Sequence, residues 1–225
     1  MFVTGLVLAA DGSPRLGVPK ELLSYQGETL LGASLDTARE CGFDQLIVTL
    51  GTASEQVRER VDLDGAWVVD SPHADTGSSS IVPALDVVDR RTDGIVVMLG
   101  DQPGVTSATV WSLVAEVAGP ATPIGVSRYD NGRGHPCFFT REMFGELRAL
   151  RRDQDIWKLI DEGPRPVTDV DAVGNVPLRV ESWDDYQALV SQYEPGGAPV
   201  VPPPAIHATR SRLHRRRRRR EGTGH

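Results

Sequence analysis

Short apolar segments alternate with amphipathic segments along residues 3–193, and this alternation constrains the fold more than any other feature of the chain. The segments typical of strands are residues 3–10, 45–51, 66–70, 94–101 and 122–129. The segments with helical spacing are residues 29–42, 54–61, 80–90, 106–119, 141–150, 153–163 and 183–193. Strands and helices in alternation favour a mostly parallel sheet with helices on both faces. We therefore expect a three-layer α/β/α domain with a Rossmann-like sheet, whose ligand would bind at the carboxyl ends of the strands.

The character of the sequence changes at residue 194. The segment "EPGGAPVVPPPA" has no core-forming pattern and is typical of a linker. It is followed by "RSRLHRRRRRREGTGH", a basic low-complexity segment of a kind that does not fold by itself. We expect one domain over residues 1–193, then a Pro/Gly linker and a basic disordered tail over residues 194–225.

The net charge of −7 hides an asymmetry between these two parts. Eight of the 24 basic residues lie beyond residue 200, together with one acidic residue, Glu221. Residues 1–200 therefore carry 16 basic and 30 acidic residues, a net charge of −14. Such an acidic surface repels polyanions at long range. We expect no nucleic-acid binding except through the arginine tail, and a phosphorylated ligand would need a metal ion and a few well-placed cations.

No apolar stretch is long enough to span a bilayer, and the start "MFVTGLVLAAD" lacks the basic region and cleavage site of a signal peptide. We expect a cytoplasmic protein that does not contact a membrane. The two cysteines, Cys41 and Cys137, are too few for a disulfide framework and indicate ordinary reduced thiols.

The loop "ADGSPRLGVPK" follows the first expected strand. Gly12 and Gly17 permit tight turns, in which successive backbone N–H groups can point at phosphate oxygens. Arg15 and Lys20 add positive charge, and Lys20 is one of only two lysines in the chain. The loop is not a P-loop, because no GKS or GKT follows the glycines. It predicts a phosphate site; a plain connection with solvated charges is the alternative.

Three further segments carry polar groups suited to a ligand. In "GDQPG", Asp101 ends an expected buried strand and could hold Mg²⁺, or it could only cap the next turn. In "NGRGHPCFF", the glycines would let the backbone approach a ligand, and His135 could line the site or cap a turn. In "HADTGSSSIVPAL", Gly77 and Ser78 precede a helix and could meet a nucleobase edge or an anion, although an ordinary serine-rich cap is also possible.

Four segments resemble, in the same order, those of the MobA-like nucleotidyltransferases, and most of all the molybdenum cofactor cytidylyltransferase branch. They are "LVLAADGSPRLGVPKELL", "MLGDQPGVTSATVWSLV", "GHPCFF…FGEL" and "VESWDDYQAL", and the similarity spans about residues 3–190. The resemblance implies a sheet of the nucleotide-diphospho-sugar transferase type. It also implies Mg²⁺-dependent transfer of a nucleotidyl group from an NTP to a phosphorylated acceptor such as molybdopterin, with release of pyrophosphate. A molybdenum enzyme or its chaperone is the protein partner that such an activity would suggest.

The matching positions carry the family's roles over to this chain. The resemblance implies that Leu8, Ala9, Ala10 and Gly12 line the base and ribose, and that Arg15 and Lys20 bind the triphosphate. The alanine pair at 9 and 10 and the "GDQP" form favour CTP over GTP. Asp101 would hold Mg²⁺.

The chain departs from the family pattern at three places. Asp11 stands where the family has glycine, and glycine best tolerates the backbone angle of that turn. The closing "D-x-D-T-P-E-D-Y" pattern is "RVESWDDY" here, so Glu181 replaces the second metal-binding Asp. After "FGEL", "RRDQDIWK" has Arg152 and Asp155 in place of two glycines and leaves Asp153 as a possible acceptor-side contact.

Two other functions stay open. Some sequences that resemble this family, of the nicotine blue oxidoreductase type, are described as NAD(P)H-dependent reductases; the absence of G-x-G-x-x-G from the first loop counts against this reading. The other is a degenerate, non-catalytic nucleotide-binding protein, which Asp11 and the lost glycines would explain.

Overall fold

The structure is a computed structural model that describes residues 1–10, 12, 15–71, 77–118, 122–150 and 156–193. Asp11 and Asp153 lie outside these residues, as do the expected linker and tail. Within the described residues, no helix is long and apolar enough to cross a membrane. Neither Cys41 nor Cys137 is in a disulfide, in line with the expected reduced thiols.

A seven-stranded sheet forms the centre of the molecule, in the order β5-β4-β1-β6-β8-β7-β9. The four strands β5, β4, β1 and β6 are parallel neighbours, β8 runs antiparallel to both β6 and β7, and β9 is parallel to β7. The strands are β1 (Val3–Ala9), β4 (Gln45–Leu50), β5 (Trp67–Asp70), β6 (Gly94–Leu99), β7 (Ile124–Tyr129), β8 (Gly132–Thr140) and β9 (Val167–Asp171). The predicted mostly parallel, Rossmann-like sheet is confirmed.

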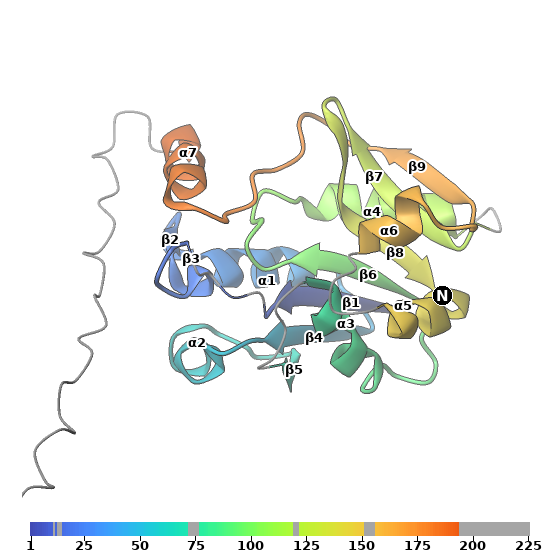
Figure 1. Ribbon diagram of the computed structural model, residues 1–225, viewed down its shortest axis with the longest axis horizontal. Coiled ribbons are helices and arrows are strands. Elements are labelled where there is room, and N and C mark those ends of the chain that lie inside the picture. The colour runs from blue at the N-terminus through green and yellow to red at the C-terminus, as the bar shows by residue number, and fades with distance from the viewer. Residues whose placement is uncertain (11, 13–14, 72–76, 119–121, 151–155, 194–225) are drawn as a thin grey trace, which may run out of the picture.

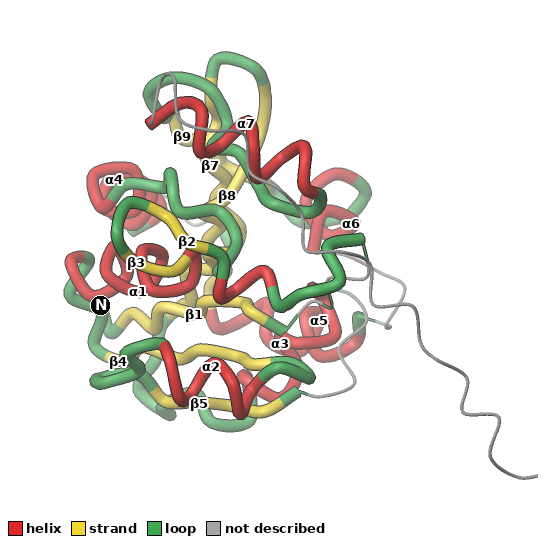
Figure 2. The backbone as a smooth tube through the Cα atoms, turned by 90° about the vertical axis from the view of Figure 1, so that its left-hand side faces the viewer, coloured by secondary structure: helices red, strands yellow, loops and turns green. Residues whose placement is uncertain are grey.

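Helices cover both faces of this sheet, because successive side chains of each strand point to opposite faces. On β1, Val3 and Val7 pack with α1 (Leu30–Glu40), α2 (Ser54–Arg60) and α4 (Ser107–Val117). Leu6 and Leu8 of the same strand pack with α3 (Gly77–Leu85), α5 (Phe144–Ala149) and α6 (Ile156–Asp161). Figure 2 shows α1 and α4 on one side of the strands and α3 and α5 on the other. The predicted three-layer arrangement is therefore confirmed.

The carboxyl ends of the parallel strands face the left of Figure 1, on the side where α7 (Trp183–Tyr193) and the hairpin of β2 (Ser24–Tyr25) and β3 (Glu28–Thr29) lie. There α7 packs on the loop after β1 and on the β2–β3 hairpin. Trp183 Nε1 donates to the Leu16 carbonyl at 3.1 Å, and Tyr186 Oη donates to the Ser24 carbonyl at 2.7 Å. Residues from the two ends of the domain thus pack together beside the carboxyl ends of the parallel strands.

The segment around His135 forms a strand that the sequence pattern does not predict. Residues 132–140 are β8, which pairs antiparallel with both β6 and β7. A Cβ added at Gly134 would lie 2.9 Å from Val176 Cγ1, so this glycine accommodates a neighbouring segment rather than a ligand. The pairing of β7 with β8 shifts between Val126 and Ser127, and this bulge leaves His135 and Pro136 without partners in β7. The pairing of β8 with β6 ends at Cys137. Proline is tolerated in sheets at bulges because its missing N–H is not needed there.

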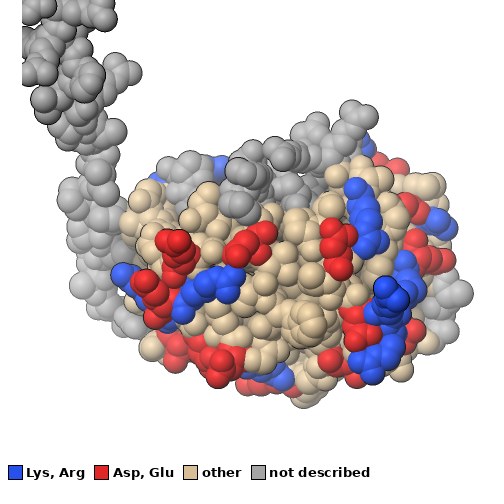
Figure 3. Space-filling model, turned by 90° about the horizontal axis from the view of Figure 1, so that it is seen from below, with Lys and Arg blue, Asp and Glu red and all other residues tan. Residues whose placement is uncertain are grey.

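Although the composition is acidic, the face shown in Figure 3 is not uniformly negative. Lys and Arg there lie beside Asp and Glu around a central area that carries neither. Many arginines of the described residues are in exposed ion pairs, such as Arg58 with Asp70 and Arg128 with Asp171. Pairs of this kind contribute little to stability, because water and salt screen them.

Candidate active site

Lys20 and Asp101 form a buried ion pair at the carboxyl edge of the sheet. The Lys20 Nζ atom lies 2.5 Å from Asp101 Oδ2, and the two side chains are 5% and 4% exposed. Lys20 begins the short 3-10 helix η1 (Lys20–Leu22), and Asp101 follows β6. The structure therefore brings the two motifs together, although 81 residues separate them in the sequence.

A segment near the C-terminus completes this cluster. Arg179 Nε lies 3.1 Å from Asp101 Oδ2, and Arg179 Nη1 lies 3.2 Å from Glu181 Oε1. Arg15 Nη1 reaches Glu181 Oε2 at 3.8 Å, with both side chains largely solvated. Four of the predicted site residues, Arg15, Lys20, Asp101 and Glu181, thus lie in one chain of ion pairs, with Arg179 at its centre. We call these five residues the ion-pair cluster.

Backbone contacts fix the C-terminal segment against the "GDQPG" turn. The Val180 N–H donates to the Asp101 carbonyl at 3.0 Å. The Gln102 Nε2 atom donates to the Pro177 carbonyl at 2.7 Å, and a Cβ added at Gly104 would lie 3.0 Å from Pro177 Cβ. Asp101 and Glu181 are therefore held on two segments that are bound tightly to each other.

The donors of the cluster fit a hard divalent cation. Asp101 Oδ1 is buried and has no hydrogen-bond partner in the part of the chain that the structure describes, so one carboxylate oxygen is left for a ligand. Glu181 adds a second, half-exposed carboxylate. No group of three His, Cys, Asp or Glu side chains that could hold a metal is found among the described residues. Mg²⁺ and Mn²⁺ prefer oxygen, and Mg²⁺ commonly uses one or two carboxylates together with phosphate oxygens and water.

His135 lies near this cluster and is buried. Burial, and next the positive charge of Arg179, lower the pKa of His135 to about 4, against a smaller opposite effect of Asp101. Its ring packs edge-on against Trp157, with centroids 5.5 Å apart. Bulges in strands often redirect a side chain next to a site, and the bulge in β8 occurs at this residue. His135 is therefore neutral at pH 7, so its ring can donate one hydrogen bond and accept another but contributes no charge.

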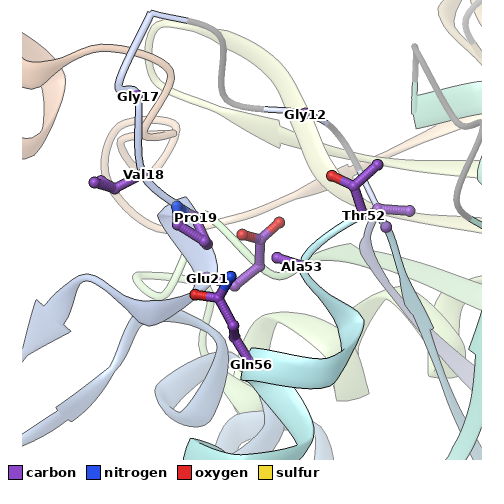
Figure 4. A pocket seen from close by; sticks show the side chains of 10 residues that line it. Gly12, Gly17, Val18, Pro19, Glu21, Thr52, Ala53 and Gln56 are labelled. Atoms are coloured by element: carbon purple, nitrogen blue, oxygen red, sulfur yellow. The ribbon is translucent and has the colours of Figure 1, made fainter. Parts of the chain in front are cut away.

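A pocket of about 230 Å³ opens beside the cluster, between the loop after β1 and the loop after β4. In Figure 4, Glu21 from η1 and Gln56 from α2 extend into the same space, with Thr52 and Gly12 nearby. Its lining residues are Ala10, Gly12, Gly17, Val18, Pro19, Glu21, Gly51, Thr52, Ala53 and Gln56. The pocket offers backbone groups, a carboxylate, an amide and a hydroxyl to a small polar ligand.

Gly51 lets the two loops come this close. A Cβ added at Gly51 would lie 2.5 Å from the Ala10 carbonyl oxygen, closer than Cβ atoms approach in real structures. Because that oxygen belongs to the backbone, it could give way only if the end of β1 moved. The shape of the pocket thus depends on the absence of a side chain at this position.

The other predicted site residues are placed as follows. Ala10 and Gly12 line the pocket, whereas the side chains of Leu8 and Ala9 belong to β1 and pack in the core on opposite faces of the sheet. Gly77 and Ser78 form the start of α3. Asp153 lies outside the described residues, so its expected role stays a prediction.

Sequence reasoning missed Arg179, Glu21, Gln56 and Thr52. Arg179 had one signal, because it stands two residues before Glu181 in a motif where the family has an acidic residue. Glu21 directly follows Lys20, but nothing in the sequence indicates that the two side chains face different spaces.

Comparison with known proteins shows which family the chain resembles. A family model described as "MobA-like NTP transferase domain" matches residues 5–167. The nicotine blue oxidoreductase of Paenarthrobacter nicotinovorans is 34% identical over 187 residues, which cover 80% of this chain and 83% of that protein. The bifunctional protein GlmU of Trichlorobacter lovleyi is 28% identical over 155 residues, which cover 67% of this chain and 34% of GlmU.

Solved structures give a similar result. The Rv0371c homologue from Mycobacterium sp. strain JC1 is 48% identical, with a TM-score of 0.79, over 84% of this chain and 96% of that one. Rv0371c of Mycobacterium tuberculosis in complex with manganese is 48% identical, with a TM-score of 0.77, over 85% and 99% of the two chains. A nucleotidyl transferase from Methanothermobacter, Mth528, shares the fold at 21% identity, with a TM-score of 0.69 over 85% and 97%.

The fold is thus the Rossmann-like fold of the nucleotidyltransferases. With 163 consecutive residues matched by its family model, the chain belongs to the MobA-like NTP transferase domain family.

Proposed function

We propose that the protein is a metal-dependent nucleotidyltransferase that moves CMP from CTP to a phosphorylated acceptor such as molybdopterin and releases pyrophosphate. The observation that carries the proposal is the buried Lys20–Asp101 pair, with an unpartnered Asp101 oxygen, beside a pocket at the carboxyl edge of the sheet. The family supports NTP transfer, and the manganese complex of Rv0371c supports a divalent metal. CTP, Mg²⁺ and molybdopterin rest on the sequence motifs alone.

In this proposal the pocket and the ion-pair cluster bind different parts of the nucleotide. The base would enter the pocket, where Glu21 and Gln56 face it, and the triphosphate would extend toward Lys20 and Arg15. A carboxylate beside an amide can accept from the exocyclic amino group of cytosine and donate to its carbonyl. The same pair could also meet guanine, so the choice between CTP and GTP rests on the alanine pair at 9 and 10.

The chemistry needs positioning and charge rather than a covalent intermediate. An oxygen of the acceptor phosphate attacks the α-phosphorus in line, a new phosphorus–oxygen bond forms, and the bond to pyrophosphate breaks. Lys20 and Arg15 neutralise the negative charge that develops on the leaving pyrophosphate. Asp101 and Glu181 would hold the divalent metal, which when bound screens the phosphate charges. Neutral His135 contributes hydrogen bonds at the edge of this site.

The direct test is transfer by the full chain. α-Labelled CTP, MgCl₂ and molybdopterin are incubated with the wild-type protein and with Asp101→Asn, and labelled product and pyrophosphate are measured. The proposal expects both products in equal amounts from the wild type and neither from the variant. Transfer that is equally fast with Asp101→Asn would contradict the proposal. It would also be contradicted if the wild type released pyrophosphate from none of the NTPs.

The similarity to nicotine blue oxidoreductase favours a second candidate function, an NAD(P)H-dependent reductase. In that case the pocket would hold part of a dinucleotide and Asp101 would not be needed for binding. NADPH binding that does not depend on metal and survives Asp101→Asn would support the reductase. Binding of CTP that requires both Mg²⁺ and Asp101 would support the nucleotidyltransferase.

A further inference from the structure

Arg179 lies between the two carboxylates that would hold the metal. Its Nε atom is 3.1 Å from Asp101 Oδ2, and its Nη1 atom is 3.2 Å from Glu181 Oε1. A single guanidinium thus pairs with both carboxylates, in the place where a shared divalent cation would supply positive charge. The protein itself therefore supplies a cation between the two carboxylates.

The backbone holds Arg179 near the site, while its side chain keeps access to water. The neighbouring Val180 N–H donates to the Asp101 carbonyl, which holds residue 179 at the edge of the sheet. The Arg179 side chain is 32% exposed, in contrast to Lys20 at 5%. It can therefore turn away from Asp101 without becoming a buried unpaired charge, whereas Lys20 cannot.

The charges of the cluster favour one order of binding. The ion-pair cluster contains the cations Arg15, Lys20 and Arg179 and the anions Asp101 and Glu181, a net charge of +1 for these five side chains. A divalent cation that arrives alone meets a positive group and competes with Arg179 for the negative charge of both carboxylates. A triphosphate that arrives with the metal reverses this balance, because it is strongly anionic and gives Arg179 a new partner.

We propose that Arg179 is an internal counter-ion that couples the two ligands, so that the metal binds tightly only together with a nucleoside triphosphate. This inference rests on the proposed function, since it assumes that Asp101 and Glu181 bind the metal of a nucleotidyltransferase. Because coupling is reciprocal, the metal strengthens triphosphate binding by the same factor. Arg179 is here a positioning residue: it sets which ligand combination the carboxylates accept.

Binding of Mn²⁺ measures this coupling without turnover. Free Mn²⁺ is followed by electron paramagnetic resonance with the full chain, with and without an α,β-methylene analogue of CTP, and corrected for the metal that the analogue binds by itself. For the wild type we expect the analogue to tighten Mn²⁺ binding on the order of tenfold or more. For Arg179→Gln we expect Mn²⁺ alone to bind on the order of tenfold tighter than in the wild type, and the effect of the analogue to shrink accordingly.

Three variants make the result specific. Arg179→Lys keeps the charge and is expected to retain most of the coupling. Arg128→Gln removes an arginine from the exposed pair with Asp171 on β7, and its Mn²⁺ binding should equal that of the wild type. Adding Asp101→Asn to Arg179→Gln should abolish the gained Mn²⁺ affinity, which would place the gain at this site.

Either of two outcomes would overturn the inference. One is tight Mn²⁺ binding by the wild type without the analogue, unchanged in Arg179→Gln. The other is loss of analogue binding in a folded Arg179→Gln without any gain in Mn²⁺ affinity, which would make Arg179 an ordinary phosphate ligand. Both would leave the transferase proposal intact. If the predicted Mn²⁺ coupling is observed but the transfer assay detects no product, the proposed reaction is rejected. The role of Arg179 in metal binding would then still stand.

Discussion

Lys20 and Asp101 bind each other in a space from which water is almost excluded, with Nζ 2.5 Å from Oδ2. One residue comes from the loop after the first strand and the other from the turn after β6, so the pair links the two motifs that the sequence singled out. Two further contacts surround it, Arg179 on Asp101 and the Gln102–Pro177 hydrogen bond. The pair is thus both a structural element and the centre of the proposed site.

Lys20→Met is expected to cost both stability and activity. Removing one partner of a buried ion pair leaves the other charge poorly compensated and typically costs about 3–5 kcal/mol. Because Arg179 remains on Asp101, we expect the lower part of that range in urea unfolding. Nucleotidyl transfer should fall by about a hundredfold or more. Lys158→Met is the matched control, since Lys158 is the other lysine and is exposed on α6; it should change neither quantity.

His135 predicts a specific dependence of stability on pH. Its pKa is lowered to about 4 in the folded protein, first by burial and then by Arg179, so the unfolded chain binds the proton more readily. Stability should be fully present above the ordinary pKa of about 6.5 and fall as the pH drops toward 4, by roughly 2–3 kcal/mol. His135→Gln has no such titration. The unfolding free energy of the wild type minus that of the variant should rise between pH 4 and 6.5 and be constant above pH 6.5. A constant difference over the whole range would show that the pKa of His135 is not lowered in the folded protein.

Gly51→Ala should close or distort the pocket. The new Cβ would lie 2.5 Å from the Ala10 carbonyl, and the backbone around it must shift. We expect a loss of about 1–3 kcal/mol in stability, as for other overpacked sites, together with at least a tenfold loss in nucleotide affinity. Gly145→Ala is the control: that glycine lies in α5 with open space around it, and alanine there should be neutral or slightly stabilising. Wild-type nucleotide affinity in Gly51→Ala would show that the pocket does not bind the base.

Gln102→Met tests the connection between the two segments that are proposed to hold the metal. The substitution removes the donor to the Pro177 carbonyl and should destabilise the protein by about 1–2 kcal/mol. Because Glu181 lies four residues beyond Pro177, we expect the affinity for Mn²⁺ plus nucleotide to fall, with the preference among bases unchanged. Gln187→Met, on the exposed face of α7, should leave both properties as in the wild type. A changed base preference in Gln102→Met would argue against the proposal that the pocket selects the base while Asp101 and Glu181 hold the metal.

The parallel half of the sheet could be predicted from the sequence because each of its strands is a short apolar segment bounded by turn residues. The same reasoning missed β8, since glycine, histidine and proline at 132–136 are typical of a loop. The bulge that accommodates Pro136 and the packing of Val176 against Gly134 are tertiary features that local patterns do not contain. The β2–β3 hairpin was missed for a simpler reason: it has only two residues per strand.

Individual site residues could be predicted better than their arrangement. Lys20, Asp101, Arg15 and Glu181 each belong to a recognisable motif, and the structure places them in one cluster. The position of Arg179 between the two carboxylates depends on how residues 177–181 lie against the "GDQPG" turn, which no single motif encodes. Glu21 and Gln56 face the same pocket only because the loops after β1 and β4 meet over Gly51.

Calorimetric titration of the full chain and of Asp101→Asn with CTP, GTP, ATP and NADPH, each with and without Mg²⁺, distinguishes the nucleotidyltransferase from the reductase. We expect the wild type to bind CTP in preference to the other three nucleotides, only when Mg²⁺ is present, and Asp101→Asn to lose this binding. Binding of NADPH that ignores both Mg²⁺ and Asp101, or no binding of any nucleotide by a folded sample, would contradict this expectation.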